Sequence, residues 1–477
     1  MRRLAGVDAL FLYNETPTQH MHTLKVGIID PSHNPDGYSF HHDKEKLASR
    51  LHLVPPFRWK VVPTPLALHH PLVVDSEVDI DFHVRRAAVP SPGGPRELGL
   101  VISEIASRPL DKSRPLWELW MIEGLPGGRV AEVAKVHHTL ADGVASVELL
   151  NQFLTHEPAE ELPHDAPPWA PEAIPRPLER LRMALRDLAR FLPQYVARIA
   201  HAAREARRRH AESLAHHVEQ PPAPGSGPDL SVNRVISAQR RFAFGELPLA
   251  DAKAVRKAFG VTLNDVVVAS IAGAMRTWLT RRGELPSVPL VGQIPVSTRN
   301  EEERKSWGNR VTAMYVAVHS EIEDPAERLR ATQRATRAAK LELQDTRGAR
   351  LSDWLELFPP FVSQLVFSRL PTWMKQRGRP SQANLTISNV PGPTEPLYYG
   401  KSLLESFYSV GPVLEGIGLN VTVWSYVDRL AVGVIACRDA VPDAWEIVDA
   451  IRASLEELVK VAATTTPPAS DPKEVSP

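Results

Sequence analysis

Short apolar runs and apolar–polar alternation recur along the N-terminal third of the chain. Segments 23–29 and 130–136 have the two-residue period of half-buried β-strands. A helical period of three and four residues occurs between Leu98 and Ile105, and again after residue 143. This part of the chain is therefore predicted to be a mixed α/β unit.

Prolines interrupt the pattern at both ends of the segment 158–230 and mark it as a linker. Between them, 178–218 is rich in Leu, Ala and Arg, with leucines on one helical face and arginines on another. Pro193 is expected to kink or split this helix. The leucines could pack on the protein's own core, or the basic segment, which ends in Arg204–Arg209, could dock on an anionic lipid surface. The pattern leaves both open.

The α/β texture returns from residue 240 onward, with strands expected at 290–296, 311–318, 385–388 and 430–435 and a helix at 325–343. The fold class is predicted to be α/β (α+β), with mixed sheets flanked by helices. The expected divisions are an N-terminal subdomain 1–157, a helical linker 158–230, a C-terminal subdomain 231–463 and a disordered tail 464–477.

Composition narrows the classes of protein. The 477 residues exceed what one hydrophobic core usually holds. Lys plus Arg and Asp plus Glu both number 56, so no global field would gather nucleic acid, and no nucleic-acid partner is expected. The single cysteine, Cys437, follows an apolar run and is predicted to be a buried thiol. Without a long apolar stretch or a signal core, we expect a cytoplasmic protein whose membrane contact is peripheral.

One histidine doublet stands out among the four in the chain. His137-His138 is followed by Asp142 and Gly143, and it lies between a predicted strand and a predicted helix. A strand-to-helix loop on a rigid frame is a common place for catalytic groups. The doublet is therefore the first candidate for chemistry.

The imidazole of His138 could take a proton from an alcohol and later give it to a leaving thiolate, because its intrinsic pKa of about 6.5 lies near neutrality. Strand alternation predicts that His137 and His138 face opposite sides. Asp142 is expected to bind an arginine and pin the loop, and Gly143 to allow a tight turn. A purely structural histidine pair remains an alternative. No metal site is expected, since no second ligand motif accompanies the doublet.

Several further blocks occur in order along the chain. Residues 137–143 match the HHxxxDG motif of coenzyme A-dependent acyltransferases. The others are Asp8–Leu12, a PLW block with Pro115, Leu116 and Trp117, the pair Asn264-Asp265, Pro295–Arg299 followed by Gly308-Asn309-Arg310, Asn389-Val390-Pro391-Gly392-Pro393, and Gly418–Asn420. Together they resemble the bacterial wax ester synthase/diacylglycerol acyltransferase family from about residue 8 to about residue 458.

The resemblance implies a two-domain chloramphenicol-acetyltransferase-like fold with a tunnel between the halves, in which both substrates meet at His138. It makes His138 the general base and Asp142 a structural support, and it brings Asn264 and Asp265 near the active site from the second half. An ordinary helix N-terminus would also explain Asn264-Asp265. Arg299 is expected to form a salt bridge with Asp142. The residues expected to shape or bind rather than react are Pro115, Leu116, Trp117, Asn309, Asn389, Pro391 and Gly392.

The function implied is transfer of a long-chain acyl group from acyl-CoA to diacylglycerol, with wax ester synthesis from long-chain alcohols as a side activity. No cofactor or metal would be bound, and the coenzyme A thioester would be a co-substrate. The protein would sit peripherally at the inner membrane face or at lipid droplets. The alternatives are a carrier-protein-dependent condensation-type acyltransferase and a catalytically silent lipid-surface binding protein. Acceptor preference, acyl-chain length and oligomeric state are left open by the sequence.

Overall fold

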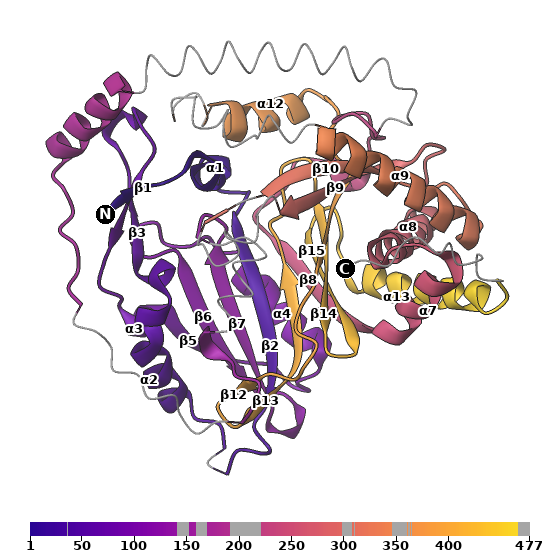
Figure 1. Ribbon diagram of the computed structural model, residues 1–477, viewed down its shortest axis with the longest axis horizontal. Coiled ribbons are helices and arrows are strands. Elements are labelled where there is room, and N and C mark those ends of the chain that lie inside the picture. Colours follow the sequence, from indigo (N-terminus) through magenta and orange to yellow (C-terminus); the bar gives the residue numbers. More distant parts are fainter. Residues whose placement is uncertain are drawn as a thin grey trace.

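The computed structural model describes residues 1–35, 37–140, 152–158, 169–190, 221–297, 308–309, 311–345, 360, 363 and 365–465. Figure 1 shows two large sheets beside each other, one built mainly from the N-terminal part of the chain and one from the C-terminal part. Each has six strands. The expectation of a two-part α/β fold is confirmed.

The N-terminal sheet has the order β12-β13-β2-β7-β6-β5, so that β7 lies at its centre. Only β5 and β6 pair in parallel. The strands are β2 (His22–Asp30), β5 (Val84–Ala88), β6 (Trp117–Glu123), β7 (Val130–His137), β12 (Tyr398–Tyr399) and β13 (Ser402–Val410). Since β12 and β13 come from late in the chain, the two halves share one hydrogen-bonded sheet.

The C-terminal sheet has the order β10-β9-β11-β14-β15-β8, and β11 runs parallel to both of its neighbours. Its strands are β8 (Arg240–Pro248), β9 (Leu290–Ser297), β10 (Val311–Val318), β11 (Leu385–Val390), β14 (Leu419–Tyr426) and β15 (Arg429–Cys437). β15 is buried along almost its whole length, which fits its unbroken apolar sequence. Cys437 is a buried free thiol, as predicted.

Helices cover the outer side of the C-terminal sheet and surround the N-terminal one (Figure 1). A small sheet of order β1-β4-β3 lies at the N-terminal edge. The remaining elements are β1 (Arg2–Arg3), β3 (Trp59–Val62), β4 (Leu72–Asp75), α1 (Gly6–Asn14), α2 (Phe40–Arg50), α3 (Ile80–His83), α4 (Pro95–Ala106), α7 (Leu249–Phe259), α8 (Leu263–Arg282), α9 (Pro325–Asp345), α12 (Leu370–Gln376) and α13 (Trp445–Ala462).

One hydrophobic core joins the two halves. The largest cluster of buried side chains includes Val26 and Ile102 from the N-terminal half and Val267 and Ile451 from the C-terminal half. Helix α4 packs on β8, where a Cβ atom at Gly99 would lie 3.0 Å from the carbonyl oxygen of Phe242. The halves therefore meet in a close-packed contact that fixes their relative position.

The linker is described only in part. Residues 177–190 form a helix that packs on the small sheet through Met183 and buries Ala184, and Asp187 accepts two hydrogen bonds from Arg3. Leu178 and Leu185 of the predicted leucine face are instead exposed. The helix thus uses one face against the protein and presents another to solvent. Pro193 and Arg204–Arg209 lie outside the described residues.

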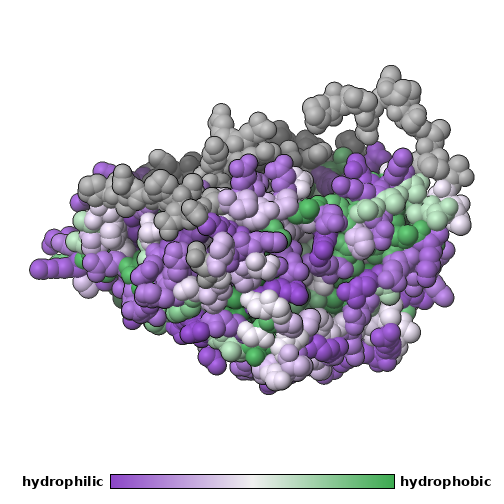
Figure 2. All heavy atoms as spheres, turned by 90° about the horizontal axis from the view of Figure 1, so that it is seen from below, coloured by the Kyte–Doolittle hydropathy of each residue, from purple (hydrophilic) through white to green (hydrophobic). Residues whose placement is uncertain are grey.

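No single helix among the described residues is long and apolar enough to cross a membrane. Only the bent pair α7 and α8 passes such a test by length and composition, and these helices meet at 104°. Figure 2 shows the molecule from below: hydrophilic residues cover most of this face, and hydrophobic ones gather on its right-hand side, where the C-terminal half lies.

Candidate active site

The histidine doublet lies at the end of β7, between strands β2 and β6. The backbone N–H of His137 donates to the carbonyl oxygen of Leu116 (2.9 Å), and that of His138 donates to Met21 (2.8 Å). The segments on both sides of the doublet thus fix it by backbone hydrogen bonds. The loop expected to follow, with Asp142 and Gly143, lies outside the described residues, as does Arg299.

The ring of His138 is half-buried and is held on two sides. Phe11 of α1 stacks on it, with ring centroids 4.1 Å apart and planes 12° from parallel. Its Nδ1 lies 3.0 Å from Oδ1 of Asn309. An imidazole with one packed face and one engaged nitrogen has little rotational freedom, which suits a group that must meet a reacting atom.

Asn309 connects His138 to Asp8. Its side-chain amide nitrogen donates to Asp8 Oδ1 and to the carbonyl oxygen of His138, both at 2.7 Å, and its backbone N–H also donates to Asp8 Oδ1 at 2.7 Å. The preceding Gly308 has φ +98°, and a Cβ atom there would lie 3.1 Å from Asp8 Oδ2. Glycine at 308 therefore allows the backbone to approach the Asp8 carboxylate.

His137 is fully buried and makes different contacts. Its Nδ1 accepts from the backbone N–H of Thr139 (3.1 Å), and its Nε2 lies 3.5 Å from Oε2 of Glu15. Lys112 lies 2.5 Å from the same oxygen. Burial by itself would raise the pKa of Glu15, but the hydrogen bonds and charges of His137 and Lys112 outweigh it and lower this pKa to about 2. The two histidines thus have different partners.

Residues in and directly after helix α1 contact the histidine doublet and Asn309, although no motif in the sequence indicated a role for them. Asp8 and Phe11 lie three residues apart in α1 and so share one helical face, and Glu15 directly follows the helix. Each of the three reaches the doublet or its partner Asn309. Asp8–Leu12 had been noted only as one end of the family resemblance.

The residues expected from the second half lie in a separate cluster. Asp265 and Thr262 form a capping box at the start of α8, and Thr336 Oγ1 donates to Asp265 Oδ1 at 2.5 Å. The side-chain amide of Asn389 donates to Asn264 Oδ1 at 3.4 Å. Among the described residues, none of these hydrogen bonds reaches His138. Asp265 therefore has the helix-terminus role that the sequence had left open.

The PLW block and the block Asn389–Pro393 hold backbone segments in position. Trp117 is buried, stacks on Phe57 (4.4 Å) and donates to its carbonyl oxygen (2.8 Å), while the adjacent Leu116 carbonyl holds His137. Gly392 follows Pro391 after β11 and donates to Ser425 Oγ (2.9 Å). A Cβ atom at Gly392 would lie 2.1 Å from the Ser425 carbonyl oxygen, so only glycine fits.

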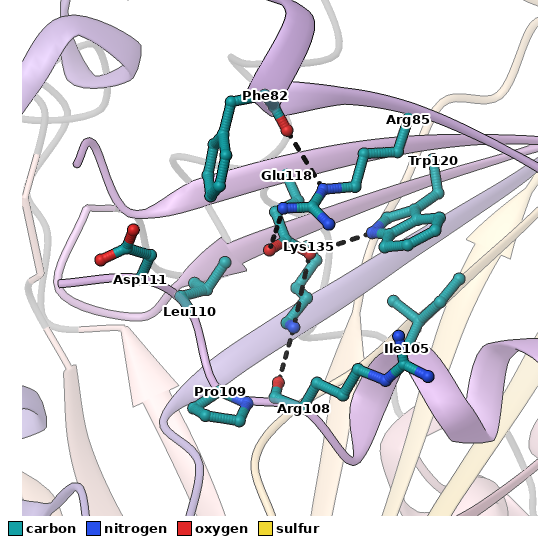
Figure 3. Close-up of a pocket in the computed structure, with 10 residues that line it drawn as sticks. All are labelled: Phe82, Arg85, Ile105, Arg108, Pro109, Leu110, Asp111, Glu118, Trp120 and Lys135. Atoms are coloured by element: carbon teal, nitrogen blue, oxygen red, sulfur yellow. Dashed lines mark hydrogen bonds and ion pairs between the residues drawn. The ribbon is translucent and has the colours of Figure 1, made fainter. Parts of the chain in front are cut away.

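A cavity of about 290 Å³ lies beside β7 on the side of Lys135 (Figure 3). It is lined by Phe82, Arg85, Ile105, Arg108, Pro109, Leu110, Asp111, Glu118, Trp120 and Lys135. Because side chains alternate along a strand, Lys135 shares the face of His137 and not that of His138. A passage leading to His138 stays a prediction.

The cavity wall is an internal polar network. Lys135 donates to the Arg108 carbonyl oxygen (2.6 Å) and lies 3.6 Å from Glu118, which also accepts from Trp120 (3.0 Å). Figure 3 shows Glu118 between these groups and the guanidinium of Arg85. Burial lowers the pKa of Lys135 to about 8, against the opposing charge of Glu118. Within the described parts of the chain, no group of three or more His, Cys, Asp or Glu side chains could hold a metal ion.

Comparison with solved structures defines the class. The chain resembles a wax ester synthase/diacylglycerol acyltransferase from Marinobacter aquaeolei VT8 with a TM-score of 0.69, 27% identity, and coverage of 97% of this chain and 100% of that one. It shares the fold of the first condensation domain of the CDA synthetase, with a TM-score of 0.55, 16% identity, and coverage of 100% and 99%. The architecture is thus that of two-domain acyl-transferring proteins.

Sequence comparison gives the family. Residues 4–267 match the wax ester synthase/diacylglycerol acyltransferase catalytic domain and residues 307–459 match the WS/DGAT C-terminal domain. A Mycobacterium tuberculosis H37Rv protein, named provisionally as a diacylglycerol O-acyltransferase, is 40% identical over 476 residues, covering 98% of this chain and 99% of that protein. The chain belongs to the wax ester synthase/diacylglycerol acyltransferase family, and it is an acyltransferase.

Proposed function

We propose that the protein transfers a long-chain acyl group from acyl-CoA to the free hydroxyl of diacylglycerol, and more slowly to long-chain alcohols, with His138 as the general base. The observation that carries this proposal is the ring of His138, stacked on Phe11 and hydrogen-bonded to Asn309 at the meeting point of the two halves. The provisional name of the mycobacterial relatives supports diacylglycerol as the acceptor.

The reaction proceeds in a ternary complex without an acyl-enzyme. His138 removes the hydroxyl proton at Nε2, because its Nδ1 is engaged with Asn309. The hydroxyl oxygen forms a bond to the thioester carbonyl carbon, and the tetrahedral intermediate then breaks the carbon–sulfur bond. The proton on His138 passes to the departing sulfur, so that the products are an ester and free coenzyme A.

Asn264 is the proposed donor to the developing oxyanion. Since Asn389 donates to its Oδ1, the Asn264 amide nitrogen remains the side of the group that can donate. Such a donor contributes about 3 kcal/mol to transition-state stabilisation. The salt bridge between Asp142 and Arg299 remains part of the proposal as a support for the loop after the doublet.

The protein is proposed to work at a lipid surface, because both acceptor classes are insoluble in water. The outward face of helix 177–190 supports this role, since it exposes Leu178 and Leu185 beside Arg182 and Arg186. Replacing both arginines with Gln should reduce sedimentation with phosphatidylglycerol vesicles and leave turnover of detergent-solubilised substrate unchanged. Unaltered sedimentation would exclude this face from lipid binding.

Thiol release from palmitoyl-CoA tests the function directly. Dioleoylglycerol and hexadecanol are offered in parallel to the wild-type protein and to a His138→Gln variant of matched thermal stability. Release that depends on diacylglycerol and disappears in the variant is expected. Release only with hexadecanol would make the protein a wax ester synthase, and none with either acceptor would favour a lipid-surface binding protein. Release by the variant at the wild-type rate would remove His138 as the base.

A further inference from the structure

We propose that Asp8 is a positioning residue that acts through Asn309 to set the tautomer of His138. The inference rests on the proposed function of His138 and adds two residues to it. It starts from the contacts that join Asp8 to the catalytic ring through one amide side chain.

The orientation of the Asn309 amide follows from its neighbours. One end of the amide meets Asp8 Oδ1 and the His138 carbonyl oxygen, both at 2.7 Å, and both of these are acceptors. That end must be the NH₂ group, because a carbonyl oxygen there would face two other oxygens. The Asn309 Oδ1 is consequently directed at Nδ1 of His138, at 3.0 Å.

The orientation of the amide decides where the imidazole carries its proton. An amide oxygen can only accept, so Nδ1 of His138 must carry the hydrogen. In the neutral ring the lone pair is then on Nε2, which is the state a general base needs. If the amide turned over, its NH₂ group would favour the opposite tautomer, with the hydrogen on Nε2 and no base at that position.

Asp8 makes the turned amide unfavourable. It is buried, with 4% of its surface exposed, and Asn309 is fully buried. A carboxylate in such a place must receive hydrogen bonds, and Asn309 supplies two of them, from its backbone and from its side chain. Without the carboxylate, the backbone oxygen of His138 would be the one remaining acceptor described for the NH₂ group.

The arrangement also joins the two halves of the protein. Asp8 and His138 fall within the catalytic-domain match, whereas Asn309 falls within the C-terminal-domain match. The tautomer of His138 is thus correct only when the segment around Gly308 is docked on α1. Competence of the base depends on contact between the halves.

Asp8→Ala tests the inference. We expect kcat for thiol release to fall about 100-fold, with KM for palmitoyl-CoA within about twofold of wild type, because a base is lost and binding groups are not. In Asp8→Asn, kcat should fall by no more than about 10-fold, since the Asn side-chain oxygen can still accept hydrogen bonds from both N–H groups of Asn309. Asp187→Ala, which removes a half-buried carboxylate paired with Arg3 elsewhere, is the matched control and should keep wild-type kcat.

The tautomer itself is measured by long-range ¹H–¹⁵N spectra of protein with ¹⁵N-labelled histidine, in which His138→Gln identifies the resonances. Wild type should show Nδ1 protonated, and Asp8→Ala should move population to the Nε2-protonated form. If Asp8→Ala does not fold, Asn309→Ala tests the same connection, because it removes the amide that joins Asp8 to His138. A folded variant with unchanged tautomer and kcat overturns this inference alone, whereas an active His138→Gln would overturn the proposed function.

Discussion

The two faces of β7 at its end differ in how they use buried polar groups. On one face, His137 and Lys135 are fully buried and are paired with Glu15 and Glu118. On the other, His138 is half-buried and is held by Phe11 and Asn309. Glu15 and Lys135, at the first face, have strongly shifted pKa values, and the second face holds the ring that is proposed as the base.

The comparison shows that a shifted pKa does not by itself identify a catalytic group. The pKa of Lys135 is lowered by burial, and that of Glu15 is lowered by His137 and Lys112 against the effect of burial. The hydrogen-bond contact between Nδ1 of His138 and Asn309 Oδ1 orients its ring. Orientation, in addition to burial, separates the histidine proposed as the base from its buried neighbour His137.

Replacing each histidine with Gln should separate the two faces most strongly. His138→Gln should lower kcat about 1000-fold and leave the thermal midpoint close to wild type, because it removes a base from a half-buried position. His137→Gln should lower the thermal midpoint and reduce kcat by no more than about 10-fold. Thiol release and thermal unfolding measure both. Equal losses of kcat would contradict the division of roles.

Glu15→Gln should destabilise the fold by about 2 kcal/mol, because it removes a buried carboxylate that forms an ion pair with Lys112 and contacts the ring of His137. The pKa of Glu15 is lowered to about 2, so its contribution to stability is present above its unfolded pKa of about 4.5 and is lost as pH falls toward 2. Urea unfolding at several pH values should show a smaller acid-dependent loss in the variant. An identical pH dependence in the two proteins would show that Glu15 is not ionised in this pair.

Lys135→Met should have a smaller effect, with stability changed by about 1 kcal/mol and kcat within about twofold of wild type. Because the folded pKa is lowered to about 8, the unfolded chain binds more protons between pH 8 and about 10.5, and wild-type stability gains a contribution as pH rises through that range. The variant should lack this gain in urea unfolding. A large loss of kcat would instead assign the cavity of Figure 3 to the reaction.

Thr262→Ala should have the smallest effect on turnover. It removes the N-cap of α8, and we expect a loss of about 1 kcal/mol in stability with unchanged kcat below the unfolding temperature. The variant shows how much a loss of stability alone lowers the measured rate of thiol release. A fall in kcat beyond the loss of folded protein would show that the position of Asn264 depends on this N-cap.

Many elements of the fold, the family and two residues of the site could be predicted from the sequence. Alternation and helical periods predicted β2, β7, β9, β10, β15, α4 and α9, because period-two and period-3.6 patterns report directly which face of an element is buried. The order of the motif blocks gave the family resemblance, and the comparisons confirm it. The motif blocks pointed to His138 and to Asn309 separately, but the contact between the two residues could not be predicted.

Only the tertiary structure decided how the blocks meet. Asp8 and Asn309 are 301 residues apart, and β13 completes a sheet begun by β2, because long-range pairing depends on the packing of the whole core and leaves no periodic mark in either segment. The helix 177–190 likewise packs Met183 against the small sheet and buries Ala184, although Leu178 and Leu185 of its leucine stripe are exposed. Local pattern fixes the elements, and burial shared between distant segments fixes the site.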